Sequence, residues 1–365
     1  MRHRFHSLCP YFAMFPEEFA KTWIERLTKK NEVVLDPFCG RGTAPFQALL
    51  LGRRAVGCDI NSVAYCITKA KMNAPTLAAV CRRLTTLEAE YVPRLWEGRR
   101  RMLPEFFHYA YAPKTLKQIL FMKQRLDWRR SDTDCMVAAL LLGALHGESQ
   151  KSPSYLSNQM PRTISTKPAY SVRFWQEREL EPPERDVFQV LRNLAEYRYA
   201  SEPPRGENCI LETDMRKLPR YREQFPGKVR CVITSPPYLD VTSFEEDQWL
   251  RLWFLGGSEW PKRGVVSKDD RYENPTSYWR FIAEIWRMLS SLLARRADIV
   301  IRLGGRGIDP ERTIRMLVGS SKFFNRKISL VSQETSPLKG RQTGSFRPGS
   351  EGCLAEVDCH FQATE

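Results

Sequence analysis

No run of about 18 consecutive apolar residues occurs in this sequence, so we expect no membrane-spanning helix and no membrane partner. The stretch from Met1 to His6 lacks the apolar segment that a secretory signal needs. The ten cysteines include no CxxC pair and no His/Cys spacing typical of zinc, so no metal site is expected. Several cysteines, such as Cys58 and Cys231, lie inside apolar runs, which fits reduced thiols in a cytoplasmic protein.

An excess of acidic residues is also absent, because the formal net charge is +15. Such a basic balance favours a polyanionic partner, of which nucleic acid is the commonest, although a soluble basic protein without such a partner is the alternative. The hydrophobic content of 42% and the nine tryptophans indicate a globular protein. A chain of 365 residues is long enough for about two folding units.

A Gly-rich turn follows the apolar strand that we expect at residues 33–35. Its glycines, Gly40 and Gly42, lack the Cβ that would keep a ligand from the backbone. Thr43 is placed to cap the helix expected at residues 44–51. The order of strand, turn and helix is typical of a ligand site in an α/β fold.

The same turn lacks the features of phosphate-binding turns. No Gly-Lys-Ser/Thr sequence follows, and Pro45 replaces the third glycine of a dinucleotide fingerprint. An acid, Asp36, stands at the start of the turn instead. This composition favours a cationic or zwitterionic ligand over a phosphate.

A second strand is expected at residues 55–60, and it ends with Asp59. In doubly wound folds, an acid at this position binds ribose hydroxyls. The alternative is that Asp59 caps the following helix. The Gly-rich turn about 20 residues upstream favours the ribose role.

The stretch 234–238, Thr-Ser-Pro-Pro-Tyr, follows a β-branched apolar strand expected at residues 229–233. Pro236 and Pro237 have no backbone N–H, so they end strand pairing and form a stiff corner. The carboxyl end of a strand in an open α/β sheet is where ligands bind. An ordinary loop after a strand is the alternative interpretation.

Together these motifs resemble the S-adenosylmethionine-dependent amino-methyltransferases of DNA, which modify the exocyclic amino group of cytosine or adenine. The resemblance rests on Asp-Pro-Phe-Cys-Gly-Arg-Gly-Thr at 36–43, on the acid that ends the next strand, and on the corner at 234–238. It covers residues 11–72 and 208–303. Serine in place of aspartate at position 235 resembles the cytosine-amino subset.

The resemblance implies a doubly wound, mostly parallel, seven-stranded Rossmann-like sheet that binds S-adenosylmethionine. It also implies that an acid after the strand at 209–214, here Asp214, contacts the adenine ring of the cofactor. The segment Phe-Pro-Glu-Glu-Phe-Ala, at 15–20, resembles the part of the family that lines the methionine end of the pocket. The expected cofactor-binding residues are Phe15, Asp36, Pro37, Phe38, Gly40, Gly42, Thr43, Asp59, Ile60 and Asp214.

We expect the catalytic domain at residues 1–72 and 207–365, interrupted by a mainly helical insertion at 73–206. The family's recognition region more often follows the strand that ends at Asp214, so this insertion is a candidate target-recognition region in an unusual place, and an RNA substrate stays open. Helices are expected at 77–95, 113–126, 137–145, 184–199, 244–255, 277–293 and 310–318, and further strands at 298–303 and within 323–361.

Two loops combine basic side chains with few acids. One spans 149–170 and contains Arg162 between aromatic residues, and the other spans 336–349. Basic side chains interleaved with aromatics suit a nucleic-acid surface, whereas ordinary or disordered basic loops are the alternative. The candidate nucleic-acid contacts are Arg162, Lys339, Arg341 and Arg347.

Methyl transfer to an amino group needs positioned hydrogen-bond acceptors and no metal. The Ser235 hydroxyl and the Pro236 carbonyl would accept from the amino group and stabilise the positive charge that develops there. Pro237 keeps these acceptors in place, and the Tyr238 ring would stack on a base flipped out of the duplex. A cysteine nucleophile, as in ring-carbon methylation, is disfavoured because neither Cys39 nor Cys231 has a suitable position.

We therefore predict methylation of the amino group of cytosine in DNA, with a restriction endonuclease as a candidate partner. The alternatives are adenine amino-methylation, RNA base methylation and an inactive nucleic-acid-binding protein that retains the cofactor. The target sequence and the oligomeric state have no signature in the sequence.

Overall fold

The computed structural model describes residues 2–11, 15–147, 155–160, 167–239, 247–261, 275–304, 309–337 and 355–365. The chain divides into two compact units. The helical unit consists of Met1–Pro10, Lys69–Pro203 and Phe244–Gly264, and the sheet unit of Tyr11–Thr68, Pro204–Ser243 and Val265–Glu365.

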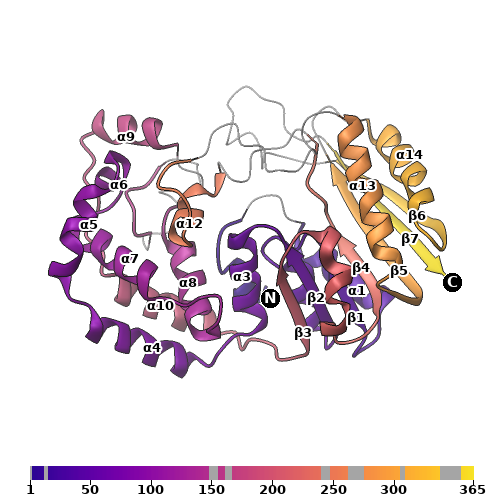
Figure 1. Ribbon diagram of the computed structural model, residues 1–365, viewed down its shortest axis with the longest axis horizontal. Coiled ribbons are helices and arrows are strands. Elements are labelled where there is room, and N and C mark those ends of the chain that lie inside the picture. Colours follow the sequence, from indigo (N-terminus) through magenta and orange to yellow (C-terminus); the bar gives the residue numbers. More distant parts are fainter. Residues whose placement is uncertain are drawn as a thin grey trace. The chain divides into compact units, whose positions relative to one another are not determined.

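The sheet unit contains, among the described residues, a seven-stranded sheet with the strand order β3-β2-β1-β4-β5-β7-β6 (Figure 1). Strands β1 to β5 run parallel, whereas β7 is antiparallel to both β5 and β6. The predicted doubly wound, mostly parallel, seven-stranded fold is confirmed. The strands are β1 Val33–Asp36, β2 Arg54–Asp59, β3 Asn208–Glu212, β4 Val229–Thr234, β5 Leu293–Gly304, β6 Lys327–Pro337 and β7 Ala355–Thr364.

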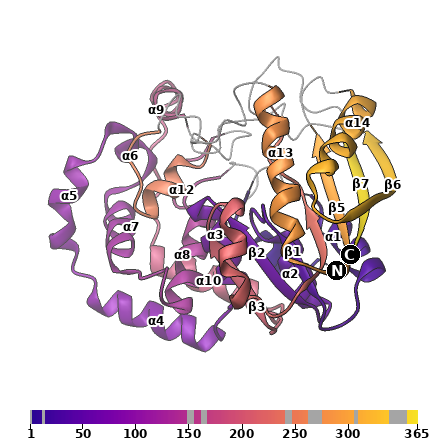
Figure 2. The same cartoon turned by 45° about the vertical axis from the view of Figure 1, so that its right-hand side comes forward.

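The central strands are buried on both faces, which is why they appear in the sequence as continuous apolar runs. On one face, Leu35 and Val56 pack with Ile285 and Trp286 of α13, which lies along the sheet (Figure 2). Helices α1 and α2 pack together, and α2 also packs on β1 and β2. The helices of the sheet unit are α1 Glu17–Leu27, α2 Thr43–Leu50, η3 Met215–Gln224, α13 Pro275–Ser290, α14 Pro310–Ser320 and η5 Ser321–Phe323, with α3 Ser62–Met72 ending in the helical unit.

The strand order reverses between β1 and β4, which are neighbours in the sheet. Such a reversal opens a crevice at the carboxyl ends of the strands, where ligands of doubly wound folds bind. Because β7 is antiparallel, its first residues lie at this same edge, and Glu356 pairs with Gly304 at the end of β5. The fold therefore brings the ends of β1, β2, β3 and β4 and the start of β7 to one edge.

The helical unit contains most of the segment that we expected to be an insertion, and two further pieces. The N-terminal residues and the segment around 247–261, both expected in the catalytic domain, belong to it. Its helices are η1 Arg4–Ser7, α4 Leu77–Glu90, η2 Pro93–Trp96, α5 Glu97–Met102, α6 Glu105–Ala110, α7 Pro113–Arg125, α8 Asp132–Ala144, α9 Pro168–Gln176, α10 Val187–Tyr199 and α12 Trp249–Phe254.

Long-range contacts explain why these two pieces belong to the helical unit. The Trp253 ring of α12 lies 4.5 Å from that of Phe107, and the buried Arg251 guanidinium donates to the Leu142 carbonyl at 2.9 Å. Near the N-terminus, Arg4 donates to the carbonyl of Tyr197 at 2.9 Å. In the part of the chain that the structure describes, no helix is long and apolar enough to cross a membrane.

Candidate functional site at the carboxyl edge of the sheet

A buried hydrogen bond joins the Gly-rich turn to the Thr-Ser-Pro-Pro-Tyr corner. The Thr234 hydroxyl, at the end of β4, donates to Asp36 Oδ1, at the end of β1, over 2.7 Å. The Phe38 amide donates to the same oxygen at 3.1 Å. Thr234 is 0% and Asp36 1% exposed, so these groups are inside the protein. The two motifs singled out from the sequence therefore form one site, although they are almost 200 residues apart.

Asp36 is electrostatically unusual. Burial raises its pKa from 3.8 to about 7, and the charge of Asp59 raises it too, while the hydrogen bonds from Thr234 and Phe38 act in the opposite direction. Both of these donors are neutral groups, so they offset only part of the cost of burying a carboxylate. A cation at this position would favour the ionised form.

The conformation of the Gly-rich turn requires glycine. Gly40 has φ +51° and Gly42 has φ +72°, both in the left-handed region that other residues rarely adopt. A Cβ on Gly42 would also lie 2.7 Å from the Thr68 side chain of α3. The close approach at Gly42 is thus to the protein itself, and its expected role toward a cofactor stays a prediction. The expected cap is wrong, because Gly42 is the N-cap of α2 and Thr43 is its first residue.

Asp59, at the end of β2, shapes this turn. Its carboxylate accepts the Gly40 amide and the Asn61 amide, each at 2.9 Å. Asn61 Oδ1 in turn accepts the Val63 amide at 2.8 Å, so Asn61 rather than Asp59 caps α3. The alternative interpretation of Asp59 as a helix cap is therefore wrong. Ile60, the next expected cofactor residue, is 52% exposed.

Asp214 lies after β3 and caps η3. It accepts the Arg216 amide at 2.9 Å and the Arg216 guanidinium at 2.6 Å. Arg216 also lies 3.5 Å from Glu284 of α13. The carboxylate expected to contact the adenine ring is thus already in an ion pair, and its contact with a cofactor stays a prediction.

The acids of three strand ends surround the thiol of Cys58. Burial raises the pKa of Cys58 well above its ordinary value, and the charges of Cys39, Asp59, Asp36 and Asp214 raise it further. The carboxyl groups of Asp36, Asp59 and Asp214 are therefore close enough to the Cys58 thiol to act on it, which places all three at one edge of the sheet.

The aromatic residues expected around the cofactor pack within the sheet unit. Phe15 is buried, and its ring lies 5.2 Å from that of Phe19 on α1. The Phe38 ring lies 5.5 Å from that of Phe281, and the Pro37 carbonyl accepts the Cys58 thiol at 3.3 Å. These contacts hold α1 and the turn in place.

The Thr-Ser-Pro-Pro-Tyr corner has a hydrogen-bond partner that the sequence did not reveal. The Ser235 hydroxyl donates to the Tyr238 hydroxyl at 3.2 Å, and Tyr238 donates to Glu356 of β7 at 2.8 Å. Glu356 also pairs with Arg302 of β5 at 3.2 Å. Pro236 is buried and Pro237 is half-buried. The Tyr238 hydroxyl has a structural partner, while stacking of its ring on a base stays a prediction.

Comparison with known proteins supports a methyltransferase. A family model of DNA methylases of the N6/N4 methyltransferase type matches residues 3–70, which include the Gly-rich turn. No curated protein matches the chain.

Solved structures give a weaker likeness. The rRNA methyltransferase aviRa from Streptomyces viridochromogenes is 14% identical with a TM-score of 0.34, over 96% of this chain and 86% of that one. An rRNA methylase from Streptococcus thermophilus is 8% identical with a TM-score of 0.36, over 97% and 99% of the two chains. Their rRNA substrates therefore carry no argument about the substrate of this chain.

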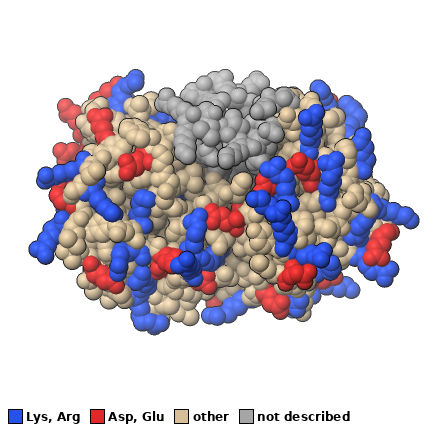
Figure 3. Space-filling view, viewed as in Figure 1, with Lys and Arg blue, Asp and Glu red and all other residues tan. Residues whose placement is uncertain are grey.

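The candidate nucleic-acid contacts Arg162, Lys339, Arg341 and Arg347 lie outside the described residues. On the face of the molecule seen in Figure 3, blue basic and red acidic side chains are interspersed over the described residues.

Cys231 is completely buried, and burial raises the pKa of its thiol. This environment disfavours a thiolate nucleophile.

Proposed function

We propose that this chain is an S-adenosylmethionine-dependent methyltransferase whose substrate is the exocyclic amino group of cytosine in DNA. The observation that carries the proposal is the hydrogen bond between Thr234 and Asp36, which fixes the corner beside the Gly-rich turn. The two elements flank the point where the strand order reverses, so a base at one and a cofactor at the other would be neighbours.

The residues at the edge fit the cofactor. S-adenosylmethionine supplies a methyl group on a positively charged sulfonium, and the carboxylates of Asp36, Asp59 and Asp214 suit a ligand with cationic groups and ribose hydroxyls. The Thr43 hydroxyl is buried and has no hydrogen-bond partner among the described residues, so a polar ligand group would satisfy it. We propose Asp59 for the ribose and Asp214 for the adenine, the latter with displacement of Arg216.

The corner would bind and orient the amino group. The Ser235 oxygen and the Pro236 carbonyl would accept its two N–H groups, which makes the nitrogen more nucleophilic and stabilises its developing charge. Tyr238 would stack on the flipped base. Serine at position 235, rather than an acid, favours cytosine over adenine. We propose that the helical unit recognises the target. From the resemblance to DNA amino-methyltransferases we also propose that a restriction endonuclease is a functional partner of this protein.

Product analysis tests this function. The protein is incubated with labelled S-adenosylmethionine and DNA, and the DNA is digested to nucleosides and separated. We expect label in N4-methylcytosine. Label in N6-methyladenine, or product on RNA but none on DNA, would overturn the substrate, and absence of any product on either nucleic acid would overturn methyl transfer.

A substitution at the corner links the activity to this site. Ser235→Ala removes one acceptor, and we expect kcat to fall by about 100-fold, as for loss of one stabilising group in a preorganised site. The matched control is Ser329→Ala, at an exposed position of β6. Full activity of Ser235→Ala would remove the corner from the mechanism.

A further inference from the structure

Ser235, Tyr238 and Glu356 form a continuous hydrogen-bonded chain from the corner to β7. The distances are 3.2 Å from Ser235 Oγ to the Tyr238 hydroxyl and 2.8 Å from that hydroxyl to Glu356 Oε1. The Glu356 side chain is 16% exposed, and its other oxygen lies 3.2 Å from the Arg302 guanidinium. Arg302 is held in turn by two hydrogen bonds of 2.7 Å to Asp358.

The chemistry of these groups fixes the direction of every hydrogen bond in the chain. A carboxylate can only accept, so the Tyr238 proton points to Glu356. The Tyr238 oxygen is then left as an acceptor, and the single proton of Ser235 points to it. Ser235 therefore presents only lone pairs on its remaining side. Such an oxygen can accept from an amino group but cannot donate to a carbonyl, which distinguishes the two kinds of exocyclic group on a base.

We propose that Glu356 is the terminal proton acceptor of this chain and that Tyr238 relays to it the proton which the methylated amino group must release. The inference rests on the proposed function. When the amino nitrogen forms its bond to the methyl carbon, the carbon–sulfur bond breaks and its electron pair stays on sulfur. The nitrogen is then positively charged. Its proton passes to Ser235 while the Ser235 proton passes to Tyr238 and the Tyr238 proton to Glu356, so that the nitrogen and the carboxylate both become neutral and neither hydroxyl changes its charge.

The environment of Tyr238 supports a relay through the neutral phenol. Burial raises the pKa of Tyr238 well above its ordinary value, and the negative charge of Glu356 acts in the same direction. A free tyrosinate is thus excluded at neutral pH. In the relay, each hydroxyl gives up one proton as it receives another, so neither Ser235 nor Tyr238 has to ionise.

A purely structural role predicts a different outcome from the same substitution. If Glu356 only anchors the Tyr238 ring, an uncharged acceptor of the same shape suffices. Glu356→Gln provides one, because its amide oxygen still accepts from the Tyr238 hydroxyl. An amide cannot take the proton, so this variant removes the relay while its oxygen keeps the bond from Tyr238. Its NH2 group, like the guanidinium of Arg302, can only donate, so the pair with Arg302 is lost.

The experiment compares Glu356→Gln, Tyr238→Phe and the double variant in steady-state methylation of DNA. We expect each single change to lower kcat by about 100-fold, the usual size of a general-base contribution, with KM for DNA and the Kd of the cofactor within about twofold of the original. The double variant should be no slower than Tyr238→Phe alone, because either change breaks the same chain. The matched control is Glu334→Gln, which removes an equal charge at an exposed position of β6.

The outcomes separate this proposal from the one on which it rests. Wild-type protein without product on DNA refutes the proposed function. Active wild-type protein with a Glu356→Gln variant at the original kcat refutes the relay alone, as does a double variant whose loss is the product of the two single losses. Thermal unfolding checks that Glu356→Gln is folded. If this variant is unfolded, Tyr238→Phe tests the relay instead, because it leaves the pair of Glu356 and Arg302 intact. Tyr238→Phe at full kcat then refutes the relay.

Discussion

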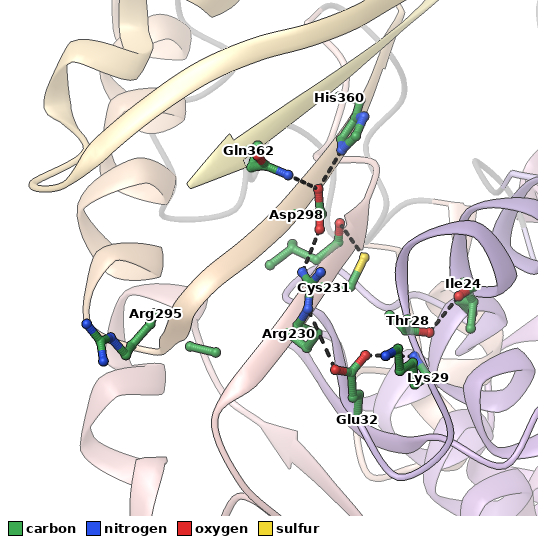
Figure 4. A network of polar contacts seen from close by, with 12 residues as sticks. Ile24, Thr28, Lys29, Glu32, Arg230, Cys231, Arg295, Asp298, His360 and Gln362 are labelled. Carbon is green, nitrogen blue, oxygen red and sulfur yellow. Dashed lines mark hydrogen bonds and ion pairs between the residues drawn. The ribbon is translucent and has the colours of Figure 1, made fainter. Parts of the chain in front are cut away.

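Two buried aspartates, Asp298 and Asp36, lie on the strands that flank β4. Their pKa values are shifted in opposite directions, because their hydrogen-bond partners differ in charge. Asp298 of β5 is 2% exposed and bonds to His360 at 2.8 Å, to Arg230 at 2.5 Å and to Gln362 at 3.4 Å (Figure 4). Burial acts to raise the pKa of Asp298, but these bonds together hold it below its usual range. Asp36 of β1 is equally buried, has neutral donors, and its pKa is raised to about 7.

The difference separates a buried charge that the chain itself compensates from one whose compensation is incomplete, and we propose that the second is prepared for a ligand. The charge of Asp298 is compensated by groups that the chain itself supplies, and Figure 4 shows them converging on it from β4 and β7. The carboxylate of Asp36 costs free energy until a cation binds beside it. A buried acid whose compensation is incomplete is therefore a marker of the site, and the acid with a full set of partners is not.

Removing a partner of Asp298 should cause the largest loss of stability. Arg230→Ala leaves the buried carboxylate with His360 and Gln362 and without its strongest cation. We expect the free energy of unfolding to fall by about 3 kcal/mol, as when one member of a buried ion pair is deleted. Denaturant unfolding measures this. The control is Arg295→Ala, whose pair with Glu365 is exposed and should be worth less than about 1 kcal/mol. Equal losses in the two variants would contradict the structural role of the cluster.

Asp36→Asn should make the protein more stable at high pH. The folded pKa of Asp36 exceeds its unfolded value, so wild-type stability falls as the pH rises from about 4 to about 7 and then stays level. Asparagine can still accept from Thr234 and Phe38 but does not ionise. The rise of this pKa from 3.8 to about 7 corresponds to a gain of about 4 kcal/mol at pH 8.5, which disappears below pH 4. Thermal unfolding across this pH range measures it.

The same variant should lose affinity for the cofactor. A neutral amide does not attract a cation, so we expect the Kd for S-adenosylmethionine to rise by about tenfold, which corresponds to 1.4 kcal/mol. Isothermal titration calorimetry at pH 8 measures the constant. A variant that gains stability and keeps its affinity would show that Asp36 is buried for a reason unrelated to a cationic ligand.

The smallest effect on stability is expected when Asp214 loses its partner Arg216, whose side chain is partly exposed to solvent. The Arg216 side chain is 45% exposed, so its pair with Asp214 is screened. Arg216→Ala should lower the free energy of unfolding by less than about 1 kcal/mol. If Arg216 has to leave Asp214 before the adenine ring can bind, Arg216→Ala should bind S-adenosylmethionine slightly more tightly than the wild type, as measured by isothermal titration calorimetry. A clear loss of affinity in this variant would contradict the displacement of Arg216.

Local patterns predicted the sheet and the position of its edge. Runs such as Val33 to Leu35 and Ile299 to Ile301 are apolar and β-branched, because strands buried on both faces must be. Asp36 and Asp59 directly end β1 and β2 in the sequence, so their common edge followed from the expected parallel topology. The cap of α2 was assigned to the wrong residue, because Thr43 is a good capping residue and only the left-handed backbone of Gly42 places the helix start one residue earlier.

Contacts between distant segments had no local signature. Glu356 is 118 residues from Tyr238, and nothing around it in the sequence marks it as part of the site. The one signal available was the direction of β7, because an antiparallel strand starts at the edge where its parallel neighbours end. Membership of α12 in the helical unit depends likewise on Trp253 reaching Phe107, which no periodicity reveals.

The place of β7 inside the sheet has a consequence for biosynthesis. It leaves the ribosome after every other strand described here, yet it lies between β5 and β6. Until it arrives, the Ile299–Val300–Ile301 run of β5 has a bare hydrogen-bonding side on a strongly apolar strand. Such an edge readily pairs with other chains. The nascent protein is thus most prone to aggregate just before β7 completes the candidate site, and this is the interval in which we expect chaperones to bind it most.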